Sequence, residues 1–323
     1  MIRRVKARAY ANIALIKYWG KYSVAGNIPA TPSISLALES LATETEIVRT
    51  DSNIDEILIN DAPAEADSYR RISSYLDLWR DKGIIWGRFS ITSKNNFPTA
   101  SGLASSASGF AALAKALSGF AERKLSLREL SILARLGSGS AARSIPGGLA
   151  VMPKSKNPSA RLLYGPKEIN FAMVIVITER DNRKIPSTEG MLHSSKTSPY
   201  YRLWLKQALV DYKAMLTALR KTDFPKIGEI AEWNALAMHS CMIASRSPLI
   251  YWNPTTLEII TAVRKWREGG IKVYFTIDAG PNVALICRRD EIDRITEMAE
   301  GIDGVIDVIP SEPGAAAEII EIE

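Results

Sequence analysis

Hydrophobic and polar residues alternate along the first 50 positions of the chain in the manner of β-strands. The segments ISLAL at 34–38 and TETEIVRT at 43–50 have a period of two and several β-branched residues, which is typical of strands with one buried face. The pattern therefore predicts that the fold begins with antiparallel strands.

The next part of the chain combines helical and strand periods. Apolar residues recur at helical spacing over 66–81, and 87–93 returns to strand character. The small residues SGLASSASG at 101–109 lead into an apolar stretch that predicts a helix ending near Phe120. SLRE at 126–129 has the form of a capping box, so we expect another helix to begin there.

The second half of the chain carries most of the long helical patterns. The apolar run FAMVIVIT at 171–178 predicts a buried strand, and the character changes from about residue 186. The elements expected after that point are helices at 199–221, 224–240, 254–268 and 290–300, strands at 272–278 and 282–289, and a final strand pair within 304–322. This mixture, with hairpin-like spacings, favours an α+β fold over a doubly wound sheet. We expect two domains, 1–185 and 186–323.

Composition and charge narrow the classes of function. The chain has 323 residues, of which 46% are hydrophobic and 24% charged, as in ordinary globular proteins. Its net charge of +6 is spread along the sequence without a block of like charge, so we expect no nucleic-acid partner. The longest apolar run is far shorter than the ~20 residues that span a bilayer, and no signal-peptide cleavage site follows the N-terminus. We therefore expect a cytoplasmic protein without membrane contact.

Cysteine, histidine and glutamine are scarce. Two cysteines, Cys241 and Cys287, and two histidines cannot supply a zinc site with the usual paired spacing, so we expect no metal site of this kind. The single glutamine, Gln207, hints at a hot environment, in which an intracellular disulfide is permissible. A disulfide between Cys241 and Cys287 is therefore one alternative, although two buried free thiols are favoured.

Two loops of small residues are candidates for binding anions. SGLASSASG exposes backbone N–H groups in front of a helix, where phosphate binds, although no lysine follows Gly109 as in a P-loop. GSGSAAR at 137–143 adds the hydroxyls of Ser138 and Ser140 and the guanidinium of Arg143, which can hold a carboxylate or phosphate through two hydrogen bonds. The alternatives are tight helix packing for the first loop and a glycine-rich turn with a solvated arginine for the second.

Lysines and one aspartate complete the candidates. Lys17 and Lys21 flank YWG, and Lys17 directly follows the apolar run IALI. A lysine there points its charge toward the interior or a cleft where an anion waits, or else extends to solvent. Asp278 ends the predicted strand 272–278, where it is either a turn residue or a carboxylate able to accept a proton from a substrate hydroxyl.

Five segments together resemble one family, in that family's order. They are ANIALIKYWGK at 11–21, SGLASSASGFAALA at 101–114, GSGSAARSIPGG at 137–148, STEGM with KTSPYYRLW within 187–204, and FTIDAGPN at 275–282. Over nearly its whole length the chain resembles the diphosphomevalonate decarboxylases of the GHMP kinase superfamily. The resemblance implies a ribosomal-protein-S5-like N-terminal domain, a ferredoxin-like C-terminal domain and an active cleft between them.

The resemblance also implies a reaction, namely ATP-dependent decarboxylation of 5-diphosphomevalonate to isopentenyl diphosphate, with Mg²⁺ accompanying ATP. Asp278 would accept or orient the proton of the substrate 3-hydroxyl group, and Lys17 would offset charge on the transferred phosphoryl group. The residues implied to wrap the ATP phosphates are Ser101, Gly102, Leu103, Ala104, Ser105, Ser106 and Ala107.

The remaining implied roles concern the two ends of the substrate. Arg143, with Ser138 and Ser140, resembles the group that holds the substrate carboxylate. Tyr18 and Lys21 match residues that hold the substrate diphosphate. The family also suggests a homodimer.

One position departs from the family pattern. After STEGM the chain has Leu192 and His193, where relatives often have polar or basic groups that reach the substrate phosphates. His193 could substitute when protonated, so it is a candidate substrate contact, whereas His239 is expected to pack in the core. The number of substrate phosphates is therefore open. The nearest rival substrate is 5-phosphomevalonate, and the other rivals are a mevalonate-type kinase and a non-catalytic nucleotide-binding protein.

Overall fold

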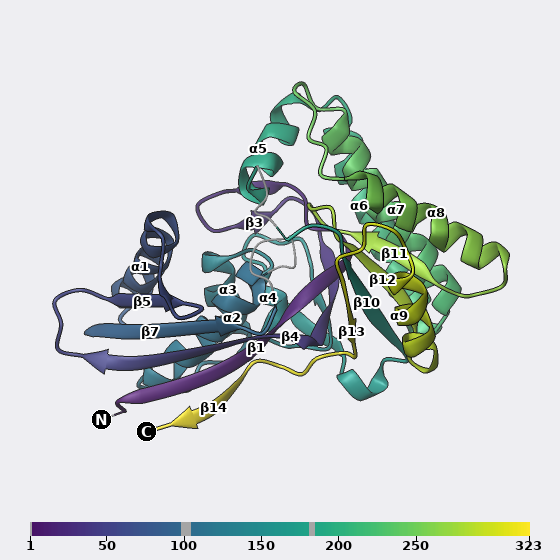
Figure 1. Ribbon diagram of the computed structural model, residues 1–323. Coiled ribbons are helices and arrows are strands. Elements are labelled where there is room, and N and C mark those ends of the chain that lie inside the picture. Colours follow the sequence, from purple (N-terminus) through teal and green to yellow (C-terminus); the bar gives the residue numbers. More distant parts are fainter. Residues whose placement is uncertain (1, 98–104, 181–184) are drawn as a thin grey trace.

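Two mainly antiparallel β-sheets organise the chain, one in each half of Figure 1. The computed structural model describes residues 2–97, 105–180 and 185–323. The first sheet has eight strands, the second has four, and β2 (Lys21–Ser23) pairs separately with β3 (Ile28–Pro29). Both sheets and helices are therefore present in the mixture that the α+β prediction requires.

The first sheet has the order β14-β1-β4-β7-β5-β6, and β8 and β9 extend it from β4. Its strands are β1 (Arg4–Ile16), β4 (Ser33–Thr50), β5 (Glu56–Ile59), β6 (Ala62–Pro63), β7 (Arg88–Asn95), β8 (Leu149–Met152), β9 (Arg161–Tyr164) and β14 (Glu318–Ile322). The segments predicted at 34–38 and 43–50 lie on the single long strand β4. Its antiparallel pairing with β1 confirms the predicted antiparallel start.

Helices α1 (Ala66–Asp81), α2 (Ser105–Leu117) and α3 (Leu127–Gly137) pack into one hydrophobic cluster with β1, β4 and β7. Helix α1 has the predicted bounds, and its buried side chains are spaced for one helical face. Helix α3 begins with the predicted capping box, in which Ser126 and Glu129 each accept the other's backbone N–H. The predicted loop 137–148 contains the single turn α4 (Ala141–Ser144).

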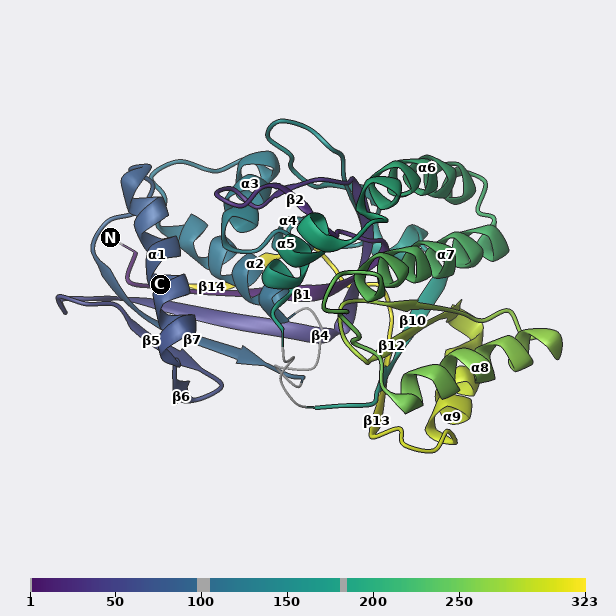
Figure 2. The same cartoon turned by 90° about the horizontal axis from the view of Figure 1, so that it is seen from above.

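The second sheet follows a β-α-β-β-α-β sequence with the antiparallel order β11-β12-β10-β13, which is ferredoxin-like. Its strands are β10 (Phe171–Ile177), β11 (Tyr274–Ile277), β12 (Val283–Arg288) and β13 (Asp307–Ser311). The helices are α5 (Ser187–Thr197), α6 (Tyr201–Arg220), α7 (Phe224–Ile243), α8 (Pro254–Glu268) and α9 (Ile292–Glu300). Seen from above, α5 lies between the two halves (Figure 2).

The predicted boundary at residue 185 does not follow the sheets. Strand β10, which it leaves in the first domain, pairs with β12 and β13, whereas β14 pairs with β1. The strands expected as a final pair, β13 and β14, therefore lie in different sheets. Met173 and Ile175 of β10 belong to a hydrophobic cluster with residues of β1, β4, α6 and α7, and Val174 and Val176 belong to another with residues of α8 and α9. An apolar run shows that a strand is buried on both faces, but it does not show which sheet the strand joins.

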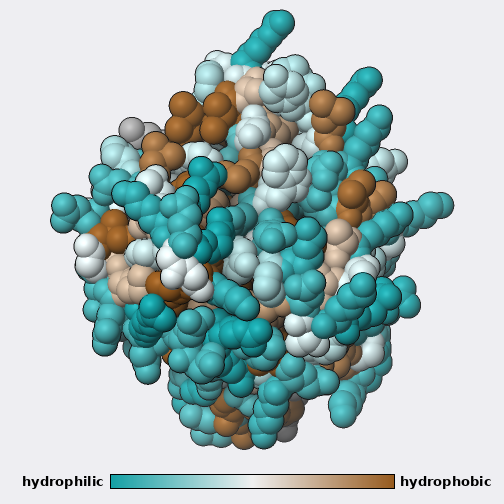
Figure 3. Space-filling view, turned by 90° about the vertical axis from the view of Figure 1, so that its right-hand side faces the viewer, coloured by the Kyte–Doolittle hydropathy of each residue, from teal (hydrophilic) through white to brown (hydrophobic). Residues whose placement is uncertain are grey.

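Both cysteines are free and buried, in different hydrophobic clusters, which confirms the favoured alternative of two free thiols. Within the described ranges, no helix is long and apolar enough to cross a membrane. The face that Figure 3 displays carries apolar groups separated by hydrophilic side chains.

Candidate active site

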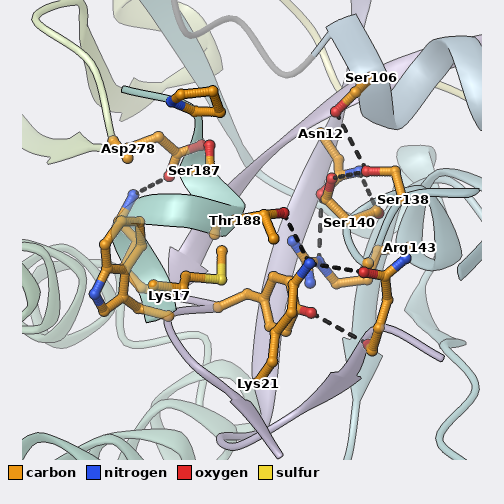
Figure 4. Close-up of a pocket in the computed structure, with 18 of the residues that line it drawn as sticks. Asn12, Lys17, Lys21, Ser106, Ser138, Ser140, Arg143, Ser187, Thr188 and Asp278 are labelled. Atoms are coloured by element: carbon orange, nitrogen blue, oxygen red, sulfur yellow. Dashed lines mark hydrogen bonds and ion pairs between the residues drawn. The ribbon is translucent and has the colours of Figure 1, made fainter. Parts of the chain in front are cut away.

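A cavity of about 200 Å³ is lined by segments from both halves of the molecule. Most of the lining residues lie in the second half of β1 and the turn after it, the α3–α4 loop, the start of α5 and the residues after β11 (Figure 4). The β2–β3 hairpin, α1, α2, α4 and α7 contribute the others. The structure brings together here the predicted residues Lys17, Tyr18, Lys21, Ser106, Ser138, Ser140, Arg143 and Asp278.

Lys17 and Asp278 form an ion pair in this cavity. The Lys17 Nζ lies 2.6 Å from Asp278 Oδ1, and the side chains are 1% and 27% exposed, respectively. Burial lowers the pKa of Lys17, while the Asp278 carboxylate opposes that shift by favouring the ammonium form. Asp278 is therefore the anion that meets the buried lysine, and extension of Lys17 to solvent is excluded.

Side chains of helix α7 contact the backbone of both residues of this pair. The Lys17 N–H donates to Asn234 Oδ1 at 2.8 Å, and Asn234 Nδ2 donates to the buried Asp211 carboxylate at 2.8 Å. His239 Nε2 lies 3.2 Å from the backbone oxygen of Asp278. Burial lowers the pKa of His239 to about 3, so the ring is neutral at pH 7 and Nε2 carries the proton that it donates. The expectation that His239 packs in the core is confirmed.

Arg143 is a second buried cation of the cavity. Its Nε donates to Ser35 Oγ and its Nη1 to Ser33 Oγ, each at 2.8 Å, and the residue is 2% exposed. Burial lowers the pKa of Arg143 to about 10, which leaves it charged at pH 7. Among the described residues, no carboxylate lies within ion-pair distance of it. A buried guanidinium whose hydrogen-bond partners are all neutral favours an anionic ligand.

Asn12, which we did not predict as a site residue, orients the Arg143 segment. Its Nδ2 donates to the Ser140 backbone oxygen at 3.1 Å and to Ser144 Oγ at 2.8 Å, and its Oδ1 accepts from Arg143 Nε at 3.3 Å. The one signal in the sequence is a polar residue inside AYANIALI at 9–16, the apolar second half of β1.

A row of hydroxyl groups joins the two small-residue loops. Ser138 Oγ lies 3.2 Å from Ser106 Oγ and 3.3 Å from Ser140 Oγ. Between the serines, a Cβ atom on Gly139 would lie 2.5 Å from the Tyr18 hydroxyl oxygen, which is too close for any side chain. The glycine therefore allows the loop to approach Tyr18.

The β2–β3 hairpin forms another part of the wall, around Lys21. The Lys21 Nζ donates to Asn27 Oδ1 at 2.7 Å and to Thr188 Oγ1 at 2.8 Å. Burial, and to a smaller extent the Arg71 guanidinium, lower the pKa of Lys21 to about 8. The Tyr18 hydroxyl donates to the Asn27 backbone oxygen at 3.2 Å. Asn27, Arg71 and Thr188 were missed because a polar residue in a turn or on a helix surface carries no distinctive signal.

A second cavity, of about 210 Å³, shares Arg71 and Ser106 with the first. Ser105, Ser106 and Gly109 line it from the first turns of α2, and side chains of α1, β4, β5 and β7 complete it. The start of a helix with small residues is a favourable place for phosphate. Within the described ranges, no cluster of three His, Cys, Asp or Glu side chains could hold a metal ion.

Not all predicted loop residues line these cavities. Ala107 is fully buried inside α2 and lines neither of them. The predicted phosphate-loop residues Ser101, Gly102, Leu103 and Ala104 lie outside the described residues.

The structure does not place His193, a predicted substrate contact, among the residues that line the cavity. His193 lies on α5 but does not line the cavity, and its Nε2 is 2.9 Å from the Ser247 backbone oxygen. Successive residues of a helix are about 100° apart, so His193 is turned about 140° from Thr188 and about 160° from Met191, both of which line the cavity. Closeness to the STEGM segment in sequence therefore did not mean closeness to the site.

Comparison with known proteins finds two family models along the chain. The diphosphomevalonate decarboxylase-like N-terminal domain matches residues 9–161, and the mevalonate 5-diphosphate decarboxylase C-terminal domain matches residues 173–305. The diphosphomevalonate decarboxylase of Candida albicans is 32% identical over 311 residues, which cover 90% of this chain and 86% of that protein.

Solved structures with the same fold include close matches over the whole chain. Mevalonate diphosphate decarboxylase from Staphylococcus aureus has a TM-score of 0.93 and 38% identity, and the match covers 99% of both chains. The structure of MDDEF in complex with MVAPP, AMPPCP and magnesium has a TM-score of 0.92 and 35% identity, over 99% of this chain and 100% of that one.

Proposed function

Because the chain belongs to the diphosphomevalonate decarboxylase family, we propose that it converts 5-diphosphomevalonate and ATP to isopentenyl diphosphate, ADP, phosphate and carbon dioxide. One observation carries the proposal: a single cavity contains the Lys17–Asp278 pair and the buried Arg143, which has no carboxylate partner among the described residues. The Lys17–Asp278 pair is suited to binding a substrate hydroxyl group that becomes phosphorylated. Arg143 is suited to binding the substrate carboxylate that leaves as carbon dioxide.

Asp278 would act on the tertiary 3-hydroxyl group of the substrate. Its carboxylate is partly exposed while Lys17 is buried, so one side of the pair remains open to a ligand. Asp278 would accept or orient the hydroxyl proton as the oxygen takes the γ-phosphoryl group of ATP. Lys17 would offset part of the negative charge on that group during transfer.

Arg143, with Ser138 and Ser140, would hold the substrate carboxylate. The bonds from Arg143 to Ser33 and Ser35 fix the plane of the guanidinium before the substrate arrives. When phosphate leaves, the electrons of the bond to the carboxylate form the new double bond and carbon dioxide departs. The carboxylate must therefore be positioned without being stabilised too strongly, in a site that excludes water.

Tyr18 and Lys21 would bind the diphosphate of the substrate, and ATP would occupy the second cavity. Ser105 and Ser106, at the start of α2, would contact its phosphates, and Arg71, which lines both cavities, would lie between the two ligands. Mg²⁺ would enter with ATP and neutralise charge on its phosphates, and the Asp278 carboxylate and the serine hydroxyls are oxygen donors that fit it. The relative bound to MVAPP, AMPPCP and magnesium supports this set of ligands.

The decisive experiment measures carbon dioxide and ADP release with ATP and Mg²⁺ on mevalonate, 5-phosphomevalonate and 5-diphosphomevalonate in parallel. The proposal requires stoichiometric release of both products with the diphosphate. Preference for the monophosphate would identify the nearest rival, and ADP without carbon dioxide would identify a kinase. ATP binding without any product would leave a non-catalytic protein.

We also propose a homodimer that works in the cytoplasm. Exposed apolar side chains on α6 and α7, including Leu203, Val210 and Trp233, are compatible with a contact between copies. Sedimentation at several concentrations tests the dimer, and cell fractionation tests the location.

A hot-environment origin is a further proposal. It is supported by ion-pair networks, in which Arg4 meets Glu46, Glu321 and Glu323. A Tm in the range of ordinary mesophilic domains, about 45–65 °C, would contradict it.

A further inference from the structure

Asn27 connects several parts of the cavity wall through its polar atoms. Its Oδ1 accepts from Lys21 Nζ at 2.7 Å, and its backbone oxygen accepts from the Tyr18 hydroxyl at 3.2 Å. Its Nδ2 donates to the backbone oxygens of Arg135 and Leu136, each at 3.0 Å, at the end of α3. These partners determine the orientation of the amide, because the reversed amide would place N–H against the ammonium and oxygen against the carbonyls.

The backbone of Asn27 is suited to this position. It has a φ of 50°, in the left-handed region that glycine and asparagine adopt most readily, and its N–H donates to the Val24 backbone oxygen at 3.1 Å. Asn27 thus ends the turn between β2 and β3 and also supplies donors for the last carbonyl groups of α3, which lack partners inside the helix.

Lys21 has hydrogen-bond partners but keeps its charge. Asn27 Oδ1 and Thr188 Oγ1 are both neutral acceptors, and among the described residues Lys21 has no ion pair with a carboxylate. An ammonium group has three N–H donors, so one remains for a ligand. Because the positive charge is not cancelled, the arrangement favours an anion such as a phosphate group.

We propose that Asn27 is a positioning residue, which sets the affinity for the phosphate end of the substrate by holding Lys21 and Tyr18 against the end of α3. The identity of that substrate rests on the proposed function, whereas the anion site does not. A neutral amide holds the ammonium in place and leaves its positive charge available to a ligand. A carboxylate at the same position would neutralise that charge.

The first test removes the side chain with Asn27→Gly, which keeps the left-handed backbone. We expect Kd for inorganic pyrophosphate, measured by calorimetry, and KM for 5-diphosphomevalonate each to rise about tenfold, as for loss of a hydrogen bond to a charged group. We expect kcat to stay within about twofold of wild type, because Asn27 has no hydrogen bond to Lys17, Asp278 or Arg143.

A second variant, Asn27→Asp, separates positioning from a merely structural role. Its carboxylate pairs with Lys21 and weakens pyrophosphate binding by competition. It also raises the pKa of Lys21, so the alkaline limit of binding, which is the pH above which pyrophosphate is no longer bound, moves to higher pH. Asn27→Gly removes an acceptor that favours the ammonium and moves that limit to lower pH. The other groups that contact or act on Lys21 are Arg71 and Thr188, and neither variant changes them.

Thr222→Gly is the matched control, since Thr222 also has a left-handed φ, of 53°, and does not line the cavity. It should leave Kd, KM and the pH limit unchanged. The proposal is overturned if wild-type protein does not bind pyrophosphate, or if both Asn27 variants bind it with wild-type affinity and an unmoved alkaline limit. If the variants behave as expected but wild-type protein releases no carbon dioxide from 5-diphosphomevalonate, the positioning role stands and the proposed reaction fails.

Discussion

Replacing Asp278 with asparagine leaves Lys17 buried without a carboxylate partner. Removing one member of a buried ion pair costs about 3–5 kcal/mol, and the partial exposure of Asp278, 27%, places this case near the lower end. A second argument limits the loss, because Lys17 can release its proton. Neutralising a lysine of ordinary pKa at pH 7 costs at most about 4.6 kcal/mol, at about 1.4 kcal/mol per pH unit. We therefore expect Asp278→Asn to lower the free energy of unfolding by about 3 kcal/mol at pH 7.

The pH dependence gives this prediction its sharpest test. Burial lowers the pKa of Lys17, and the variant lacks the carboxylate that opposes this shift. In the variant the pKa therefore lies further below its unfolded value, and stability rises with pH over a wider pH range than in wild type. The loss should shrink by up to about 2.7 kcal/mol between pH 7 and pH 9. Urea unfolding at both pH values measures it.

The same variant should retain ATP binding and release carbon dioxide orders of magnitude more slowly, because Asp278 is proposed to act in the chemical step. Asp307→Asn, which removes an exposed partner of Arg180, is the control and should change stability by less than about 1 kcal/mol. An equal loss at pH 7 and pH 9, or turnover near wild type, would refute the reasoning.

Three further predictions concern other cavity groups. Arg143→Lys should abolish most turnover, because lysine cannot reproduce the planar donors that reach Ser33 and Ser35, and an unchanged kcat and KM would contradict this. Since the pKa of Lys21 is lowered to about 8, its ammonium fraction falls above that pH, and KM for the diphosphate substrate should rise up to about tenfold per pH unit. A KM that is flat from pH 7 to pH 9.5 would exclude the role of Lys21. His193→Ala should leave kcat and KM unchanged, and a higher KM would return His193 to the site.

The parts of the fold that the sequence predicted are those determined by local pattern. The bounds of α1 and the capping box of α3 depend on residues within one or a few helical turns. The sheet that β10 or β14 joins depends on partners far along the chain, and a buried pattern is compatible with either sheet.

The candidate site shows the same limit. Lys17 and Asp278 were assigned to one site through the resemblance to a family. They are 261 positions apart, and no local pattern connects them. Asn27 and Arg71 were missed because their residue types are ordinary in a turn and on a helix. The structure alone shows that they line the cavity.

Strand β14 has a consequence for how the protein is made. Its partner β1 begins at Arg4, so this edge of the first sheet is completed by residues more than 300 positions later. During synthesis from the N-terminus, the open edge of β1 can pair with the edge of another nascent chain until residues 318–322 emerge from the ribosome. Contacts of such long range also slow folding. Yield during expression should therefore depend strongly on chaperones that shield nascent chains, and truncation before β14 should produce aggregates.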